Sequence, residues 1–250
     1  MRRFIKIISA ILISVCILIY TLAKYSRKPS VEIVVSRYNE DLSWVLLPPF
    51  NKYKIIVYNK GVNDDFEKYN VKEVVKLKNV GRCDHTYLYH IIRNYSKLAD
   101  ITLFFPGSLN MPEKFKKGRD LISEMEKCWN TVFIGPHHQS IKDEMYNFKM
   151  DNWKASSKEN SAINSEAKLE KAPIRPFGRW YEDKFGDTVT NHTSYMGILC
   201  IAKPHIIQHS KSHYRDIMRD VDHSSNPEAG HYIERSWEAI FYPIDGATIL

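Results

Sequence analysis

Cysteine is scarce in this 250-residue sequence, which contains four cysteines and no C-x-x-C pair. Cys16 lies in a long apolar run, so three cysteines remain for the rest of the chain. An odd number leaves at least one thiol free, and the cysteines therefore indicate neither a disulfide framework nor a redox compartment. The chain also lacks the G-x-S-x-G nucleophile elbow, which weakens the hypothesis of a hydrolase built on Asp84, His85 and His90.

The sequence has no clustered basic stripe and no recognised nucleic-acid-binding motif, although its formal net charge is +7. The positive charge comes from dispersed lysines. A basic surface of this kind favours anionic partners such as phosphates, and nucleic acid is not expected among the partners.

A zinc-protease signature is also missing. His205, His209 and His213 follow Pro204 at a spacing that places them on one helix face and that zinc can use. No glutamate occupies the position that H-E-x-x-H requires. Neutral imidazoles on a helix face need no ligand, so we predict no metal-binding residues, and structural zinc is the lesser alternative.

Residues 4–23 form an apolar run that is broken only by Lys6. A helix of about 20 residues spans the bilayer core, and no small-x-small cleavage site follows the run. We therefore expect residues 1–30 to be an uncleaved signal anchor with a short stalk. Basic residues flank both ends, and the short N-terminal tail favours a single-pass type II orientation, with an endomembrane lumen as the location in a eukaryotic host.

The remaining 220 or so residues alternate strand and helix signals, without a break in composition. A helix is expected from Asp84 to about Tyr95, and a second, amphipathic one over residues 230–242. Alternating strands and helices joined by short connections predict one α/β domain, residues 31–250, with a mostly parallel sheet flanked by helices. A polar stretch at residues 153–172 predicts a flexible insertion. The expected strands are residues 31–35, 53–58, 71–77, 101–105 and 196–201.

Polar residues gather where the first strand ends, in the sequence R-Y-N-E-D. Ligands of open α/β sheets bind beyond the carboxyl ends of the strands, so this turn is a candidate site. A second candidate is Glu234, in a helix that is otherwise largely apolar. A carboxylate there is costly unless it is paired, as with Arg235, or used on a substrate hydroxyl.

Five sequence blocks resemble one family of domains of uncharacterised function, found in fungal membrane-anchored proteins and large viruses. The blocks keep their order over residues 31–243: V-V-S-R-Y-N-E-D-L-S-W-V, I-V-Y-N-K-G, N-V-G-R-C-D-H-T-Y-L-Y-H-I-I, D-I-T-L-F-F-P-G and H-Y-I-E-R-S-W-E-A-I-F. This resemblance implies no reaction.

The order of elements is also distantly similar to that of GT-A nucleotide-sugar glycosyltransferases, especially family 2. The matching turns are Tyr38-Asn39-Glu40, Asn59-Lys60-Gly61 and Gly81-Arg82. The chain departs from the pattern after residues 101–105, where Pro106-Gly107-Ser108 replaces the D-x-D pair that holds a divalent cation. The resemblance implies a GT-A-like domain, a nucleotide-sugar donor and a glycan or protein acceptor, and it leaves a requirement for Mn²⁺ or Mg²⁺ open.

The same resemblance suggests roles for residues. Cations and a helix start would face the leaving diphosphate, and Glu234 would be the base, with Asp84 and Asp41 in reserve. The predicted catalytic residues are thus Glu234 and Asp84, and the predicted binding residues are Arg37, Tyr38, Asn39, Glu40, Asp41, Lys60, Gly81, Arg82, His85 and Arg235. The alternative is a membrane-anchored, non-catalytic carbohydrate-binding or scaffold domain. The missing D-x-D favours that alternative, and the density of polar residues at strand ends counts against it.

Overall fold

The computed structural model describes residue 15 and residues 27–153 and 168–250. The chain divides into two units, residues 1–30 and residues 31–250. The expected anchor, residues 4–23, lies outside the described residues apart from Val15, as do residues 154–167 of the expected insertion. Among the described residues, no helix is both long enough and apolar enough to cross a membrane.

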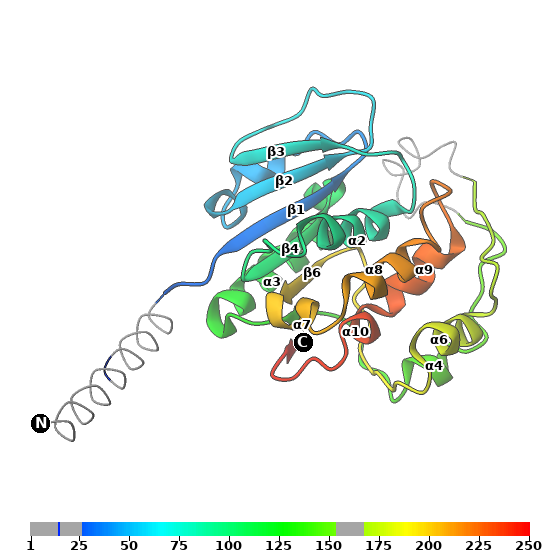
Figure 1. The fold of residues 1–250 in the computed structure, drawn as a ribbon. Helices are drawn as coiled ribbons and strands as arrows, with labels where there is room; N and C mark the ends of the chain where they lie inside the picture. Colours follow the sequence, from blue (N-terminus) through cyan, green and yellow to red (C-terminus); the bar gives the residue numbers. More distant parts are fainter. Residues whose placement is uncertain (1–14, 16–26, 154–167) are drawn as a thin grey trace, which may run out of the picture. The chain divides into compact units, whose positions relative to one another are not determined.

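A seven-stranded sheet forms the centre of the described part of Val31–Leu250 (Figure 1). Its strand order is β3-β2-β1-β4-β6-β5-β7, so β1 has β2 and β3 on one side and the other four strands on the other. The strands are β1 (Val31–Arg37), β2 (Lys54–Asn59), β3 (Val71–Lys76), β4 (Ile101–Pro106), β5 (Val132–Phe133), β6 (Leu199–Ala202) and β7 (Thr248–Ile249).

The sheet is mixed, because β6 runs antiparallel to its neighbours β4 and β5. The pairs β1–β2, β1–β4, β2–β3 and β5–β7 are parallel. The prediction of an α/β fold with helices flanking a sheet is confirmed. The expectation of a mostly parallel sheet is corrected to a mixed sheet. The apolar run that predicts β6 does not indicate whether the strand is parallel or antiparallel to its neighbours, because a buried strand has the same composition in both cases.

Helices cover both faces of the sheet, and the alternation of side chains along β1 decides which residue meets which layer. Val34 packs into the core formed with α2 and α9, whereas Ile33 and Val35 point to the core under α3. One layer contains α2 (Arg82–Asn94), α4 (Ile141–Glu144), α6 (Phe177–Phe185), α7 (Lys203–Ile207), α8 (Lys211–Met218), α9 (Glu228–Arg235) and α10 (Trp237–Ile240). The other contains α3 (Pro112–Cys128) and the short 3-10 helices Ser43–Leu46, Phe50–Lys52 and Gly107–Asn110.

The expected amphipathic helix over residues 230–242 is interrupted. α9 ends at Arg235, and Ser236, with φ −117° and ψ 12°, separates it from α10. The Ser236 hydroxyl donates a hydrogen bond to the carbonyl oxygen of Tyr232 at 2.9 Å, a local bond of the kind that competes with helix continuation. Glu234 therefore lies in the last turn of a short helix.

The three histidines of the H-x-x-x-H pattern hold the C-terminal segment through its backbone. Nε2 lies 3.2 Å from the Asp245 carbonyl oxygen in His205, 2.8 Å from that of Tyr242 in His209, and 3.0 Å from that of Ile240 in His213. A carbonyl oxygen only accepts, so each Nε2 carries the proton. Their spacing is thus explained by a structural role.

Candidate functional site

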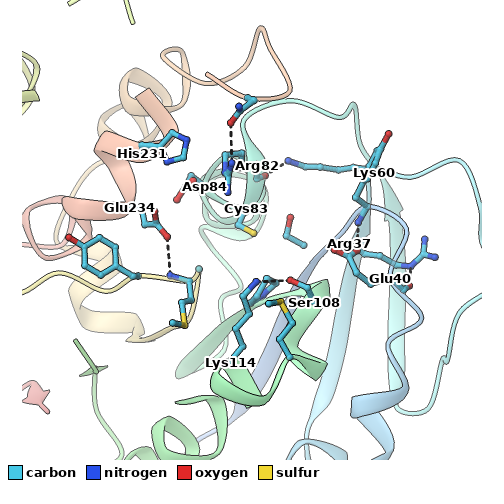
Figure 2. A pocket seen from close by; sticks show the side chains of 18 of the residues that line it. Arg37, Glu40, Lys60, Arg82, Cys83, Asp84, Ser108, Lys114, His231 and Glu234 are labelled. Atoms are coloured by element: carbon cyan, nitrogen blue, oxygen red, sulfur yellow. Dashed lines mark hydrogen bonds between the residues drawn. The ribbon is translucent and has the colours of Figure 1, made fainter. Parts of the chain in front are cut away.

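A pocket of about 820 Å³ lies at the edge of the sheet where the parallel strands β1 and β4 end. The chain places β2 and β3 on one side of β1 and β4 on the other, so the loops that leave β1 and β4 diverge here. Such a switch point is where open α/β sheets bind ligands, and the volume is within the range of roughly 300–1,000 Å³ usual for small-molecule sites. Figure 2 shows side chains from several elements around this space.

The pocket brings together some of the sequence-predicted residues and leaves others out. Those that line it are Arg37, Tyr38, Glu40, Lys60, Arg82, Asp84 and Glu234. Those that lie outside its lining are Asn39, Asp41, Gly81, His85 and Arg235.

Arg37, the last residue of β1, has a fully buried guanidinium group whose donors are largely taken by the protein. It donates to the Glu40 carbonyl oxygen at 2.6 Å, to Asn59 Oδ1 at 2.8 Å, and to the backbone and side-chain oxygens of Asn63 at 2.8 and 2.7 Å. Its guanidinium also lies 4.2 Å from the centre of the Phe66 ring. Arg37 therefore ties the ends of β1 and β2 together and has little capacity left to bind a phosphate.

The turn after β1 is held by the carboxylate of Glu40, whose Oε2 accepts the backbone N–H of Tyr38 at 2.7 Å and that of Asn39 at 3.1 Å. A Cβ added at Gly107 would lie 2.5 Å from the same oxygen, so only glycine leaves room for Glu40 against the end of β4. Asp41 points elsewhere: its Oδ1 accepts hydrogen bonds from the backbone N–H and the hydroxyl of Ser43 at the surface.

Lys60 follows β2 and crosses to the start of α2. Its Nζ donates to the carbonyl oxygen of Val80 at 2.5 Å and to that of Arg82. Burial lowers the pKa of Lys60 to about 8, and among the described residues no carboxylate forms a salt bridge with it. Its ammonium group thus adds positive charge behind the N-terminus of α2.

The start of α2 is fixed by Gly81, which has a φ of +58° and donates its N–H to the Ser224 carbonyl oxygen at 2.7 Å. A Cβ there would lie 2.2 Å from the Val221 carbonyl oxygen, so glycine is needed for both conformation and space. Arg82 begins the helix, donates from Nη1 to Asn226 Oδ1 at 3.0 Å and lies 5.5 Å from the Trp153 ring centre. The helix N-terminus and Arg82 both favour an anion.

Two carboxyl groups, Asp84 on α2 and Glu234 on α9, face the pocket together (Figure 2). Burial, followed by the negative charge of Glu234, raises the pKa of Asp84 to about 8. Asp84 is therefore protonated at neutral pH, and it can donate a hydrogen bond. Glu234 Oε1 accepts the Met196 backbone N–H at 2.9 Å, which orients its carboxylate. A carboxyl group that holds its proton, beside a second carboxyl group in the same pocket, is suited to acid–base chemistry.

Lys114 and Ser108 complete the wall beneath the end of β4, and sequence reasoning missed both. Ser108 lies in the 3-10 helix after β4, and Lys114 lies in the first turn of α3. Lys114 Nζ donates to Ser108 Oγ at 2.7 Å, and burial lowers the pKa of Lys114. In the sequence, only their position after a central buried strand marks these two residues as candidates for the site.

His231 and Asn226 also line the pocket, and each has a buried nitrogen without a hydrogen-bond partner among the described residues. These atoms are Nε2 of His231 and Nδ2 of Asn226. Burial, followed by the charge of Arg82, lowers the pKa of His231 to about 3, so the imidazole is neutral. No local pattern marks either residue, because they reach the site only through the packing of α9 and the loop before it on α2.

Two of the predicted site residues, His85 and Arg235, do not line the pocket and contact other side chains of the protein. His85 stacks on Tyr89 at a ring-centre distance of 6.1 Å, and burial lowers the pKa of His85 to about 4. Arg235 donates to the His231 carbonyl oxygen at 2.7 Å, and its guanidinium lies 3.9 Å from the centre of the Phe148 ring. Arg235 is thus not an ion-pair partner of Glu234, contrary to the alternative in which the two residues pair with each other.

The donors around the pocket do not fit a divalent cation. β4 ends at Pro106, and Gly107 and Ser108 follow it without a carboxylate. Glu40 is engaged with backbone N–H groups, and Asp84 is protonated at neutral pH. In the described part of the chain, no group of three or more His, Cys, Asp and Glu side chains is placed to hold a metal ion.

Comparison with known proteins gives a family and no reaction. The model of the family described as "Protein of unknown function (DUF3431)" matches residues 33–246. This match covers nearly all of the segment in which the five sequence blocks lie, and it confirms the expected relation to uncharacterised domains. No curated protein matches the chain.

Proposed function

Because the chain belongs to the DUF3431 family of proteins of unknown function, we propose its activity from the pocket: transfer of a sugar from a nucleotide-sugar donor to a glycan or protein acceptor. The proposal includes a GT-A-like arrangement of the domain. Support for it comes from the strand order, with β6 the one reversed strand among those described, and from the matched turns at Tyr38, Lys60 and Arg82.

The observation that carries the proposal is that positively charged groups and two carboxyl groups line one pocket at the β1/β4 switch point. Arg82, Lys60 and the N-terminus of α2 supply positive charge, and Asp84 and Glu234 supply an acid–base pair on the neighbouring wall. Sugar transfer needs both, because a diphosphate leaves with growing negative charge while an acceptor hydroxyl must lose its proton.

The step is a displacement at the anomeric carbon. The acceptor hydroxyl oxygen forms a bond to this carbon while the bond from the carbon to the diphosphate oxygen breaks. The electron pair of the broken bond stays on the diphosphate, and the hydroxyl proton passes to the carboxylate of Glu234. Asp84, which holds its own proton at neutral pH, donates a hydrogen bond to a sugar hydroxyl and so orients it.

Calorimetry with the full chain, purified in detergent that covers its apolar N-terminal run, tests the proposal. Uridine and guanosine diphosphates and their sugars are titrated with and without Mn²⁺, and micromolar binding of at least one is expected. Glu234→Gln should keep this affinity and lower turnover by about a hundredfold or more, the upper part of the range for a general base. Glu124→Gln, on the outer face of α3 beside Lys127, is the matched control.

Failure of every nucleotide to bind would exclude the transferase. Loss of nucleotide affinity together with turnover in Glu234→Gln would assign that residue a structural role instead.

A second candidate is a non-catalytic carbohydrate-binding or scaffold domain, and the absence of a carboxylate at the end of β4 favours it. Binding of glycans without binding of any nucleotide would support this candidate. In either case, membrane attachment through residues 4–23 in a type II orientation stays a prediction. Protease protection of the full chain in microsomes tests it.

A further inference from the structure

We propose that Lys114, positioned by Ser108, binds the leaving diphosphate in the place of a divalent cation, so that sugar transfer by this protein is independent of metal. This inference rests on the proposed function and names the residue that supplies the charge. It starts from the misfit between the pocket's donors and a divalent cation, and from the cation that the chain itself places under the end of β4.

Lys114 differs from Lys116 and Lys127 of α3 in its partner, and it differs from Lys117 in lining the pocket. Lys116 pairs with Asp120 at 2.6 Å and Lys127 pairs with Glu124 at 2.6 Å, both at the surface, while Lys117 donates to the Tyr195 carbonyl oxygen at 2.7 Å. In the described part of the chain, Lys114 takes part in no salt bridge, and its Nζ bonds to the neutral hydroxyl of Ser108. An ammonium group withdrawn from water beside a neutral partner is costly unless an anion completes its surroundings.

The position of this ammonium group matches what a leaving diphosphate needs. Lys114 extends from α3 into the pocket under the end of β4, and Arg82 faces the same space from the start of α2 (Figure 2). An ammonium group has three hydrogens, so Lys114 can bond to phosphate oxygens while it keeps its bond to Ser108. A diphosphate between these walls would have fixed cations on both sides.

The charge argument follows from the transfer step. When the bond between the anomeric carbon and the diphosphate oxygen breaks, one further negative charge develops on that oxygen. Lys114 stabilises it by hydrogen bonding and by its full positive charge, without giving up a proton. Divalent ions would be repelled by Lys60, Arg82 and Lys114, and they would find Asp84 protonated at neutral pH.

The test is titration of the full-length protein in detergent with uridine and guanosine diphosphates, in EDTA and in Mn²⁺. Wild type should bind with the same affinity in both. Lys114→Met should lose about tenfold to a hundredfold in affinity, the range for removing one hydrogen bond to a charged group. Lys116→Met removes a surface lysine two positions away in the same helix, and it should bind like wild type.

Two further variants separate charge from folding. Lys114→Arg keeps the cation and should lose less affinity than Lys114→Met, and Ser108→Ala removes the positioning bond and should weaken binding by a few fold. Circular dichroism compares the folding of all variants.

Wild-type binding that requires Mn²⁺, or equal binding by Lys114→Met and wild type, would overturn the inference and leave the proposed function standing. Absence of nucleotide binding by wild type in both buffers would overturn both.

Discussion

The buried carboxyl group of Asp84 makes the stability of this protein depend on pH in a way that one substitution removes. Asp84 is 5% exposed, and its pKa is raised from 3.8 to about 8 by burial and by the charge of Glu234. In the unfolded chain the group returns to its ordinary value. Asp84→Asn keeps the size of the side chain and replaces the titrating group with a neutral one.

The sign and size of the effect follow from proton binding. Between pH 3.8 and about 8 the folded state holds a proton on Asp84 that the unfolded state has lost, so the free energy of unfolding falls as pH rises through this window. The slope for one proton is about 1.4 kcal/mol per pH unit, which makes roughly 3 kcal/mol between pH 5 and pH 7. Asp84→Asn lacks this loss and should gain stability relative to wild type as pH rises.

Urea unfolding followed by tryptophan fluorescence, in identical detergent at pH 5, 6 and 7, measures the difference between Asp84→Asn and wild type. Subtraction cancels the other titrating groups that both proteins share. Asp120→Asn, which removes a surface carboxylate of α3, should follow the wild-type pH dependence. A difference between Asp84→Asn and wild type that stays constant from pH 5 to pH 7 would refute the reasoning.

Two further stability predictions rest on packing. Gly61→Ala should cost about 3 kcal/mol or more, because its Cβ would lie 1.3 Å from the Tyr38 carbonyl oxygen, whereas Gly186→Ala, with open space but a φ of +59°, should cost about 1–2 kcal/mol; equal melting temperatures would contradict the clash. Glu228→Ala should cost about 3–5 kcal/mol in chemical denaturation, because the N–H groups of Met150 and Ala172 and the hydroxyl of Tyr232 donate to its fully buried carboxylate and would lose their partner; a loss below about 1 kcal/mol would contradict this role.

Much of the sheet can be predicted from the sequence, because a buried strand leaves a local record. Val34 and its neighbours form an apolar run of the kind that a strand covered on both faces requires, and β1 is found there. The helix expected from Asp84 is α2, which starts two residues earlier, at Arg82. Strand direction leaves no such record, and the reversal of β6 is decided by its pairing with β4 and β5.

The residues of the candidate site also divide into those that the local sequence predicts and those that it does not. Glu40, Lys60 and Arg82 stand directly after strands or at a helix start, so the rule that ligands bind at the carboxyl ends of strands finds them. Arg37 obeys the same rule, yet its donors are largely consumed by neighbouring loops, which local sequence does not reveal. His231 enters the pocket because α9 packs on α2, a contact between segments far apart in the chain.

The sequence by itself determined the α/β class, the position of the main strands and the presence of polar groups at their ends, because these depend on periodicity and on residue type within a few positions. Only the tertiary structure decided which of those groups share one pocket, that the pKa of Asp84 is raised beside Glu234, and that Lys114 bonds to Ser108 just after β4. Burial and the approach of distant charges set these properties, and neither is recorded in any short stretch of the chain.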